Sequence, residues 1–403
     1  TTPVYLVDCP HLYDRPTIYG SAIDEHVRFP ALTHAALLSC QRMGFAPQIL
    51  HCNDWHTGFG PMLLKTVYAS DGLFKATRSV LTIHNIGYQG VFSAAAAADI
   101  GLGEYSTWLD PAERSTGRIN PLKEGILHAD RITTVSPTYA KEIQTPLYGW
   151  GLDGVLRDRA AALSGILNGV DYEDWDPRHD RFLPQHYGAN QLGVKASLKQ
   201  DLMQRFGLAT QGRSRVPLIG MVSRLTSQKG FELLIEVLPR LLIEREFCLA
   251  VLGSGDARYE NFFAEQAHLH PTRIAFHRGY SDELSHWIEA GSDMFLMPSQ
   301  YEPCGLNQMY SLRYGTVPIV RRTGGLADSV QHFDPATRQG TGIIFNDYDV
   351  GGINWGVNTA LDLYPQKALW RRMMQNAMAQ DFSWERQVGE YVALYERLAG
   401  TAA

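Results

Sequence analysis

The sequence predicts an α/β protein of two domains, each built on a parallel β-sheet. Two observations carry this prediction. Short apolar runs alternate with helix-like segments along the chain, and such alternation is typical of βαβ units. The chain also has 403 residues, which is more than one hydrophobic core usually serves. A content of 45% hydrophobic and 19% charged residues fits a large globular enzyme.

The alternation is clearest in the second half of the chain. Helix-like segments such as Phe231–Ile243, with apolar residues at helical spacing, separate most of the apolar runs. The predicted strands of this half are Pro217–Val222, Cys248–Leu252, Ile274–His277, Met294–Met297, Val317–Val320 and Gly342–Phe345. Those of the first half are Gln48–Cys52, Val80–His84, Arg131–Val135 and Gly165–Leu167.

A polar stretch from about Asp171 to Val216, with weaker apolar periodicity, separates the two halves. We predict an N-terminal domain over 1–170, an inter-domain passage over 171–212 and a C-terminal domain over 213–378. A C-terminal helix is predicted over 379–403, and its return to the N-terminal domain is one alternative. Folds of this class bind ligands at the carboxyl ends of their strands, so we expect a cleft there.

Composition excludes several classes of function. The formal net charge is −6 and no basic stripe is present, which argues against a nucleic-acid partner. No apolar run is long enough for a membrane span. The five cysteines are scattered without a CxxC pair, which indicates a reduced compartment rather than a disulfide framework or a zinc site.

The most informative stretch is Ser299–Gln308, followed by Arg321–Asp328. Glu302 is expected at a strand end, and Gly305 at the start of a helix, so that backbone N–H groups and a helix dipole face one point. An anion would bind there. With the later Gly-Gly turn, the pattern indicates a nucleotide-sugar diphosphate site whose acidic residue holds the sugar.

A second motif, Ser223–Gly230, leaves a strand and enters a helix. Arg224 and Lys229 are five residues apart and can converge on one anion, with a planar fork from arginine and a point charge from lysine. A solvated basic pair is the alternative. The position at the carboxyl end of a strand favours a functional role.

Four weaker motifs complete the set. His51–His56 carries polar groups for a metal or polar ligand, or for capping and support. Thr82–Gly87 places His84 at a strand end, where function is favoured over a structural role. Asn168–Asp171 is a turn signal, and Leu252–Asp256 is a glycine-rich turn without the third glycine of a dinucleotide fingerprint.

These motifs, in this order, resemble the glycogen and starch synthases of glycosyltransferase family five. The carriers of the resemblance are His51–His56, Leu81–Asn85, Ala129–Ser136, Leu167–Asp171, Ser223–Gly230, Glu302–Leu306 and Arg321–Asp328. The resemblance implies a GT-B fold, in which two Rossmann-like domains flank the active site. It implies retaining transfer of glucose from ADP-glucose or UDP-glucose to the non-reducing 4-OH of an α-1,4-glucan. It implies no metal and no cofactor, and a cytoplasmic location, or the plastid stroma for a plant protein.

The resemblance also assigns roles to single residues. Arg224 and Lys229 match the pair on the donor diphosphate, and Glu302 matches the acidic residue beside the donor glucose. His84 matches the histidine near the C6 hydroxyl of that sugar. With Glu302 as the one obvious carboxylate, the family analogy suggests a front-face displacement in which the departing phosphate accepts the acceptor's proton.

Further residues match positions that bind the donor. Asn168 and Tyr280 match residues that line the glucose and nucleotide pockets. Backbone amides in the segment Cys304, Gly305, Leu306 and Asn307 are expected near the distal phosphate. Asn307 departs from the threonine expected there, which leaves the backbone contact and puts a side-chain contact in doubt.

One departure concerns the N-terminal domain. The family carries a Lys-Thr-Gly-Gly-Leu loop after its first strand, and this chain has none near its start. We therefore expect an N-terminally incomplete domain and impaired transfer. A catalytically impaired α-glucan-binding or regulatory relative is the alternative function. A sucrose-type synthase or a glucan phosphorylase is a third, although no pyridoxal phosphate lysine motif is present.

Overall fold

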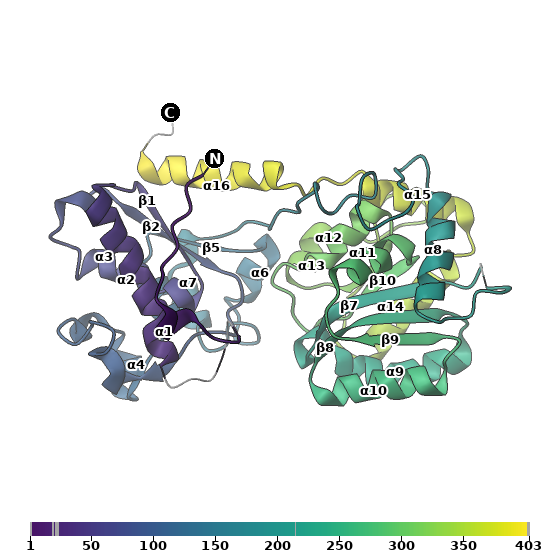
Figure 1. Cartoon of the computed structure of the whole chain (residues 1–403), viewed down its shortest axis with the longest axis horizontal. Helices are drawn as coiled ribbons and strands as arrows, with labels where there is room; N and C mark the ends of the chain where they lie inside the picture. Colours follow the sequence, from purple (N-terminus) through teal and green to yellow (C-terminus); the bar gives the residue numbers. More distant parts are fainter. Residues whose placement is uncertain (1, 18–19, 21–23, 214, 401–403) are drawn as a thin grey trace. The chain divides into compact units, whose positions relative to one another are not determined.

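A computed structural model describes residues 2–17, 20, 24–213 and 215–400 of the chain. The chain forms two compact units, Thr1–Ile166 with Glu390–Ala403, and Leu167–Gly389. Each unit has a parallel sheet with helices around it (Figure 1). The α/β prediction is therefore confirmed. The division after Ile166 differs slightly from the predicted boundary at residue 170.

The sheet of unit 1 has four parallel strands in the order β1-β2-β5-β6. They are β1 (Ile49–Asn53), β2 (Arg78–Ile83), β5 (Arg131–Thr134) and β6 (Leu163–Gly165). A short antiparallel pair is formed by β3 (Phe92–Ser93) and β4 (Arg118–Ile119). In β2 every residue after Arg78 is buried, as expected for a strand with both faces covered.

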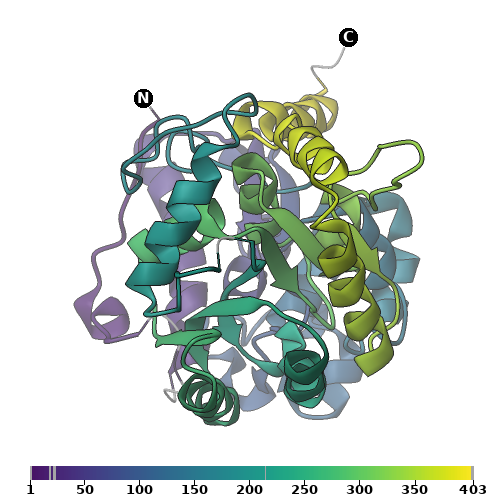
Figure 2. The same ribbon diagram turned by 90° about the vertical axis from the view of Figure 1, so that its right-hand side faces the viewer.

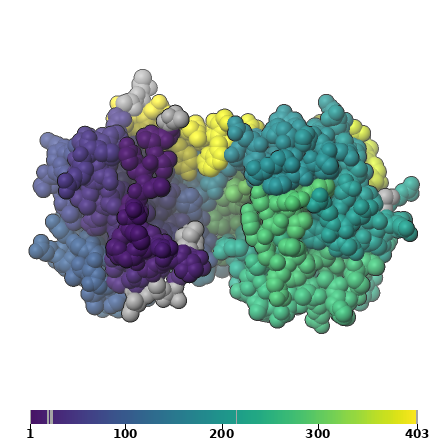
Figure 3. Space-filling view, viewed as in Figure 1, coloured from purple at the N-terminus to yellow at the C-terminus, as the bar shows by residue number. Residues whose placement is uncertain are grey.

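Unit 1 also contains several helices outside its sheets. The helices are α1 (Pro10–Tyr13), α2 (Glu25–Met43), α3 (Gly60–Lys65), α4 (Pro111–Ser115), α5 (Pro121–His128), α6 (Pro137–Glu142) and α7 (Asp153–Asp158). Asn120 and Ser136 cap the starts of α5 and α6, each followed by proline at the first helical position. The segment that carries α1 runs over the surface of unit 1 (Figure 3).

The last helix, α16 (Trp384–Ala399), leads the chain back from unit 2 to unit 1. Its Leu394 packs with Val80 and Ile166. The Tyr395 hydroxyl lies 2.5 Å from Nδ1 of His51 in β1. From Glu390 the helix therefore belongs to unit 1, and residues 401–403 of the predicted C-terminal segment lie outside the described residues.

The sheet of unit 2 has six parallel strands in the order β12-β11-β10-β7-β8-β9. They are β7 (Leu218–Leu225), β8 (Cys248–Gly255), β9 (Ile274–Arg278), β10 (Met294–Met297), β11 (Val317–Arg321) and β12 (Ile343–Phe345). Figure 2 looks onto this unit and shows helices on both faces of the sheet. They are α8 (Val194–Arg205), α9 (Phe231–Glu244), α10 (Ala257–Leu269), α11 (Asp282–Gly291), α12 (Asn307–Tyr314), α13 (Gly324–Ser329), α14 (Val350–Leu363) and α15 (Lys367–Met378).

All ten predicted strands are present, with two instructive shifts. The strand predicted at Gly165–Leu167 lies two residues earlier, as β6. The turn predicted at Leu252–Asp256 is instead the end of β8. A Cβ on Gly253 would lie 2.1 Å from the Ser223 carbonyl oxygen, so the glycine allows β8 to pair with β7 up to Gly255. The stretch predicted as a passage, 171–212, belongs to unit 2 and includes α8.

Candidate active site

The strand ends of unit 2 bring a buried carboxylate and a lysine together. Glu302 is 5% exposed. Its Oε2 accepts hydrogen bonds from Lys229 Nζ at 2.6 Å and from Ser299 Oγ at 3.0 Å. Glu302 lies in the loop after β10, five residues beyond Met297, and so not directly at the strand end as predicted. The ion pair keeps a charged carboxylate inside the protein without leaving it uncompensated.

Lys229 reaches this carboxylate from a short helix, η6 (Ser227–Lys229), that follows β7. Gly230, with φ of 79°, ends this turn, and a Cβ there would lie 2.0 Å from the Pro298 carbonyl oxygen. Only glycine allows this approach. Two further bonds join the loops, from Gln300 N to Gln228 O and from Gln228 Nε2 to Tyr301 O. The loops after β7 and β10 therefore form one tightly connected surface.

Arg224 differs from Lys229 in its environment. Its side chain is exposed at the end of β7. Within the described part of the chain, its guanidinium has no hydrogen bond or ion pair, whereas Lys229 contacts Glu302. Convergence of Arg224 and Lys229 on one anion stays a prediction. What the structure adds is that one of the two cations is already held by a protein carboxylate.

The start of α12 lies directly after the Glu302 loop. Gly305 has φ of 69° and precedes the helix, which begins at Asn307 rather than at Gly305 as predicted. The N-cap residue, Leu306, provides no capping side chain. The first N–H groups of such a helix have no intrahelical partner and carry partial positive charge. This terminus can therefore receive an anion.

The Gly-Gly turn supports the Glu302 loop, and its part in the diphosphate site stays a prediction. Gly325 N donates to the carbonyl oxygens of Glu302 and Pro303, both at 3.1 Å. A Cβ on Gly324 would lie 1.9 Å from the Glu302 carbonyl oxygen, and one on Gly325 2.0 Å from that of Cys304. The two glycines thus allow α13 to pack against the Glu302 loop. The N–H group of Gly325 is used in this support.

Sequence reasoning missed the residues that hold this loop in place. Gln308 is buried, and its Nε2 donates to the carbonyl oxygens of Cys304 and Gly305 and to Ser329 Oγ, each at 3.0 Å. Ser329 Oγ in turn donates to Gly325 O at 2.6 Å. A polar residue at a buried helix position was the available signal for Gln308. Ser299, which donates to Glu302, gave no comparable signal.

Three other predicted donor residues lie close to this loop or support it. Asn307 Nδ2 donates to the Val222 carbonyl oxygen at 2.6 Å, so its side chain ties α12 to β7. Cys304 is buried, and burial raises the pKa of its thiol to about 12. A backbone hydrogen bond from Asn168 to that thiol opposes the shift and places Asn168 beside the loop.

Tyr280 stands apart from the other residues. It follows β9, at the opposite edge region of the sheet from β12, and is 83% exposed. Its hydroxyl lies 3.4 Å from Asp282 Oδ1 at the start of α11. An exposed aromatic ring at a strand end can stack on a flat ligand.

In unit 1, His84 follows β2 and belongs to a hydrogen-bonded group. His84 Nε2 donates to Asn53 Oδ1 at 2.9 Å. The Asp54 carboxylate accepts from the backbone N–H of His84 at 2.7 Å and of Asn85 at 3.4 Å, and Asp54 itself has φ of 53°. Burial raises the pKa of Asp54. Asp54, to which the sequence assigned no role, thus holds the backbone of His84.

The rival metal site at His51, Asp54 and His56 is not assembled. His51 Nδ1 lies 2.5 Å from the Tyr395 hydroxyl and Nε2 2.6 Å from Thr82 Oγ1, so both ring nitrogens are engaged. The His56 ring stacks on Trp55 at 4.1 Å. Across the described ranges, no group of three or more His, Cys, Asp or Glu side chains is arranged as a metal site.

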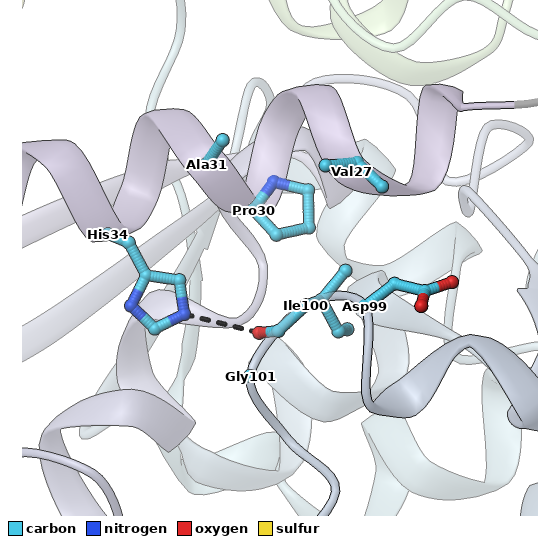
Figure 4. Close-up of a pocket in the computed structure, with 7 residues that line it drawn as sticks. All are labelled: Val27, Pro30, Ala31, His34, Asp99, Ile100 and Gly101. Atoms are coloured by element: carbon cyan, nitrogen blue, oxygen red, sulfur yellow. Dashed lines mark hydrogen bonds between the residues drawn. The ribbon is translucent and has the colours of Figure 1, made fainter.

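Unit 1 also contains a pocket of 320 Å³ between α2 and the segment Asp99–Gly101 (Figure 4). His34 projects from α2 across this pocket, and its Nε2 donates to the Ile100 carbonyl oxygen at 3.3 Å. The predicted site residues do not line it. In the described part of the chain, no helix has the length and apolar character needed to cross a membrane.

Comparison with known proteins shows the family to which the chain is related. Residues 1–158 match the family model of the starch synthase catalytic domain, and residues 209–379 that of glycosyl transferases group 1. The glycogen synthase of Koribacter versatilis is 46% identical over 397 residues, which cover 98% of this chain and 81% of that protein. The glycogen synthase of Anaeromyxobacter dehalogenans is 47% identical over 403 residues, with 98% and 83% covered.

Solved structures show the same relationship. The catalytic domain of starch synthase IV from Arabidopsis thaliana, bound to ADP and acarbose, has a TM-score of 0.88 and 36% identity over 96% of this chain and 80% of that one. Sucrose-phosphate synthase from Thermosynechococcus elongatus has a TM-score of 0.62 at 16% identity and shows the fold alone.

Two parallel α/β units, with these family and structural matches, define a glycosyltransferase of the GT-B class. The chain belongs to the glycogen and starch synthase family, glycosyltransferase family five. It is a glucosyltransferase of glycogen or starch synthesis.

Proposed function

We propose that this chain transfers glucose from ADP-glucose to the non-reducing 4-OH of an α-1,4-glucan with retention of configuration. The observation that carries the proposal is the Lys229–Glu302 pair beside the uncapped start of α12. ADP in the starch synthase IV structure supports the adenine nucleotide. The donor diphosphate is placed at α12, with Arg224 and Lys229 around it.

Arg224 and Lys229 stabilise the charge that develops on the leaving diphosphate. The ammonium of Lys229 has three N–H donors, and one of them is used by Glu302 at 2.6 Å. The others are left for phosphate oxygens. Arg224 adds a planar fork that is not engaged by another described residue. Preorganised charges of this kind are usually the largest contribution to catalysis.

Glu302 holds Lys229 and receives the donor sugar. Both of its contacts with described residues are on Oε2, which leaves Oε1 to accept a hydroxyl of the glucose. The motifs supply one carboxylate, Glu302, and not the pair that a retaining glycosidase uses. We therefore assign a front-face displacement: the bond from C1 to the phosphate oxygen breaks, the bond from C1 to the acceptor O4 forms, and the acceptor proton passes to the leaving phosphate.

Other residues orient the donor. The exposed ring of Tyr280 stacks on the adenine, and Asn168 lies beside the glucose. Backbone amides of Cys304, Gly305, Leu306 and Asn307 bind the distal phosphate, as the start of α12 favours. His84 of unit 1 accepts a hydrogen bond from the C6 hydroxyl of the glucose on Nδ1, because its Nε2 carries the proton donated to Asn53. Asn53 orients the ring of His84, and Asp54 holds its backbone.

The test is transfer from radiolabelled ADP-glucose and UDP-glucose to glycogen, with the anomeric configuration of the new linkage read by NMR. We expect transfer with retention, a preference for ADP-glucose, and undiminished activity after exhaustive chelation. Glycogen binding without transfer would replace the proposal with the glucan-binding alternative. Loss of transfer on chelation, with recovery on adding metal back, would refute the assignment of the charge to Arg224 and Lys229.

A further inference from the structure

Unit 2 contains a pocket, distinct from the Glu302 loop, that has the chemistry of a sugar site. Its volume is 440 Å³, and it lies at the end of β12 and the first turns of α14. Besides Phe345, its lining consists of Asn346, Asp347, Asp349, Gly351, Gly352 and Trp355. We call this set of residues the α14 pocket. No step of the proposed transfer uses it.

Trp355 is a large, partly exposed aromatic residue in the lining of the α14 pocket. The side chain is 48% exposed although it is large and apolar. Its indole N–H group has no hydrogen-bond partner among the described residues. The His332 ring lies beside it, with 5.7 Å between ring centroids. His332 Nδ1 accepts from Ile344 N at 3.1 Å, so this neighbouring ring is fixed by the backbone. The pocket therefore presents an aromatic face and a free donor.

Hydrogen-bonding groups of both kinds surround this ring. The Asp347 carboxylate is exposed and makes no hydrogen bond with a described residue. Asn346 Oδ1 accepts from Arg322 Nε at 2.8 Å, which leaves its amide NH₂ group as a donor. Asp349 Oδ1 accepts from Gly352 N at 2.7 Å and caps α14. A Cβ on Gly352 would lie 2.3 Å from the Asp347 carbonyl oxygen, so this wall must stay free of a side chain.

This chemistry suits a neutral polyhydroxyl ring. Two carboxylates disfavour an anion. The apolar face of a sugar stacks on indole, and its hydroxyls match a carboxylate acceptor with indole and amide donors. We propose that the α14 pocket binds a glucose unit of an α-1,4-glucan, stacked on Trp355. The choice of sugar rests on the proposed function.

The position of the pocket suggests how it serves transfer. β12 is two strands from β10 in the sheet, roughly 10 Å at the usual strand spacing, and both strands end at the same edge. The pocket therefore holds part of a long acceptor at a distance from the reacting end. A second point of attachment raises the effective concentration of that end at the site. Long acceptors gain from it and short ones do not.

The experiment measures retardation in native gels containing glycogen, together with KM for glycogen and for maltotriose. Trp355→Ala should weaken retardation and raise KM for glycogen roughly threefold to tenfold. The KM and kcat for maltotriose and the KM for ADP-glucose should stay unchanged. Trp355→Phe should retain most of the binding, and Asp347→Ala should lose less than Trp355→Ala. The matched control is Trp108→Ala in unit 1, where the side chain is 50% exposed and lies outside the α14 pocket.

Unchanged retardation of Trp355→Ala, or an equal loss in Trp108→Ala, would overturn the proposal. An equal rise of KM for maltotriose and glycogen would also do so, because it would place Trp355 in the reacting site. Wild-type protein that is retarded by glycogen but transfers no glucose would contradict the proposed function. The comparison of Trp355→Ala with Trp108→Ala in the gel would still show whether the α14 pocket binds glucan.

Discussion

The strand ends of the two units carry polar side chains of different kinds. In unit 1 they bond mainly to one another and to the backbone, as His84 does with Asn53 and Asp54. In unit 2 the loops keep a buried ion pair, Lys229–Glu302, and an exposed Arg224 without a described partner. Both edges come from parallel sheets, of four strands in unit 1 and of six in unit 2. Their difference lies in how much charge is left for a ligand.

This difference predicts different catalytic roles for the sheet edges of unit 1 and unit 2. A closed group of hydrogen bonds orients one polar side chain, such as the His84 ring, and offers little charge to a leaving group. The unit 2 edge offers two cations and an uncapped helix start. We therefore expect substitutions in unit 2 to lower turnover more than those in unit 1.

The largest effect is expected from Arg224→Ala and Lys229→Ala. Each removes a charge from the leaving diphosphate, and turnover should fall roughly a hundredfold to a thousandfold. The two variants should differ in stability, because Lys229→Ala also leaves the Glu302 carboxylate buried without its counter-charge. Transfer rates and melting temperatures measure both. Arg240→Ala is the matched control, since that arginine pairs with Glu244 on the surface of α9, outside the site. Near-normal turnover in both site variants would exclude the diphosphate role.

Glu302→Gln is expected to lower turnover at least tenfold and melting temperature by a few degrees. The amide keeps a hydrogen bond to Lys229 but removes the charge, and the group is buried. Ser299→Ala removes the other hydrogen bond and keeps the ion pair, so it should affect turnover less. If the Gln variant melts much earlier and keeps full turnover per folded molecule, Glu302 is structural only.

His84→Ala should lower turnover roughly tenfold, the equivalent of one hydrogen bond in the transition state. Stability should change little, because the Asp54 contact is to the backbone N–H of residue 84 and survives the substitution. Kinetics with ADP-glucose and thermal melting measure the two effects. A loss as large as that of Arg224→Ala would remove the contrast between the units.

Acid should destabilise unit 1 before unit 2. Burial and the nearby His84 lower the pKa of His51 to about 4, and burial with nearby Arg28 lowers that of His56 to about 4. Between pH 6.5 and 4 the unfolded chain binds protons that the folded unit does not, so stability falls as pH falls, by up to about 3 kcal/mol for His51.

Unit 2 should respond differently over the same range. Burial raises the pKa of Glu289, so the folded unit binds the extra proton and gains stability as pH falls. Burial lowers the pKa of Lys195 to about 7, so this group changes stability with pH only above that value. Hydrogen exchange, corrected for intrinsic rates, should show β1 and α16 losing protection at pH 4.5 while β7 keeps it. Earlier loss in β7 would contradict this order.

Much of the architecture could be predicted because its signals are local. Strand-sized apolar runs and helical periodicity placed all ten predicted strands of the two sheets to within a few residues. The motifs around Lys229 and Glu302 could be recognised because they place charged residues after predicted strands, where α/β folds bind ligands. Gly253 was mistaken for part of a turn, since a glycine that permits close strand pairing has the same local appearance.

The contacts between loops could not be predicted from local signals. The Lys229–Glu302 pair spans 73 positions, and the Gly324–Gly325 turn supports a loop some 20 residues earlier. Such pairings depend on the order of strands in the sheet. The role of Gln308 depends on acceptors in two segments, the Glu302 loop and α13. Sequence patterns identify such residues as polar and do not show what they bind.

The central claim is that the strand ends of unit 2 bind the diphosphate of the donor. Calorimetry with ADP and with adenosine, on wild type and Arg224→Ala, tests it most directly. The account predicts that ADP binds wild-type protein much more tightly than adenosine, and that Arg224→Ala weakens ADP at least tenfold while adenosine is unaffected. Equal ADP affinity in wild type and Arg224→Ala, or an equal loss for ADP and adenosine, would contradict it.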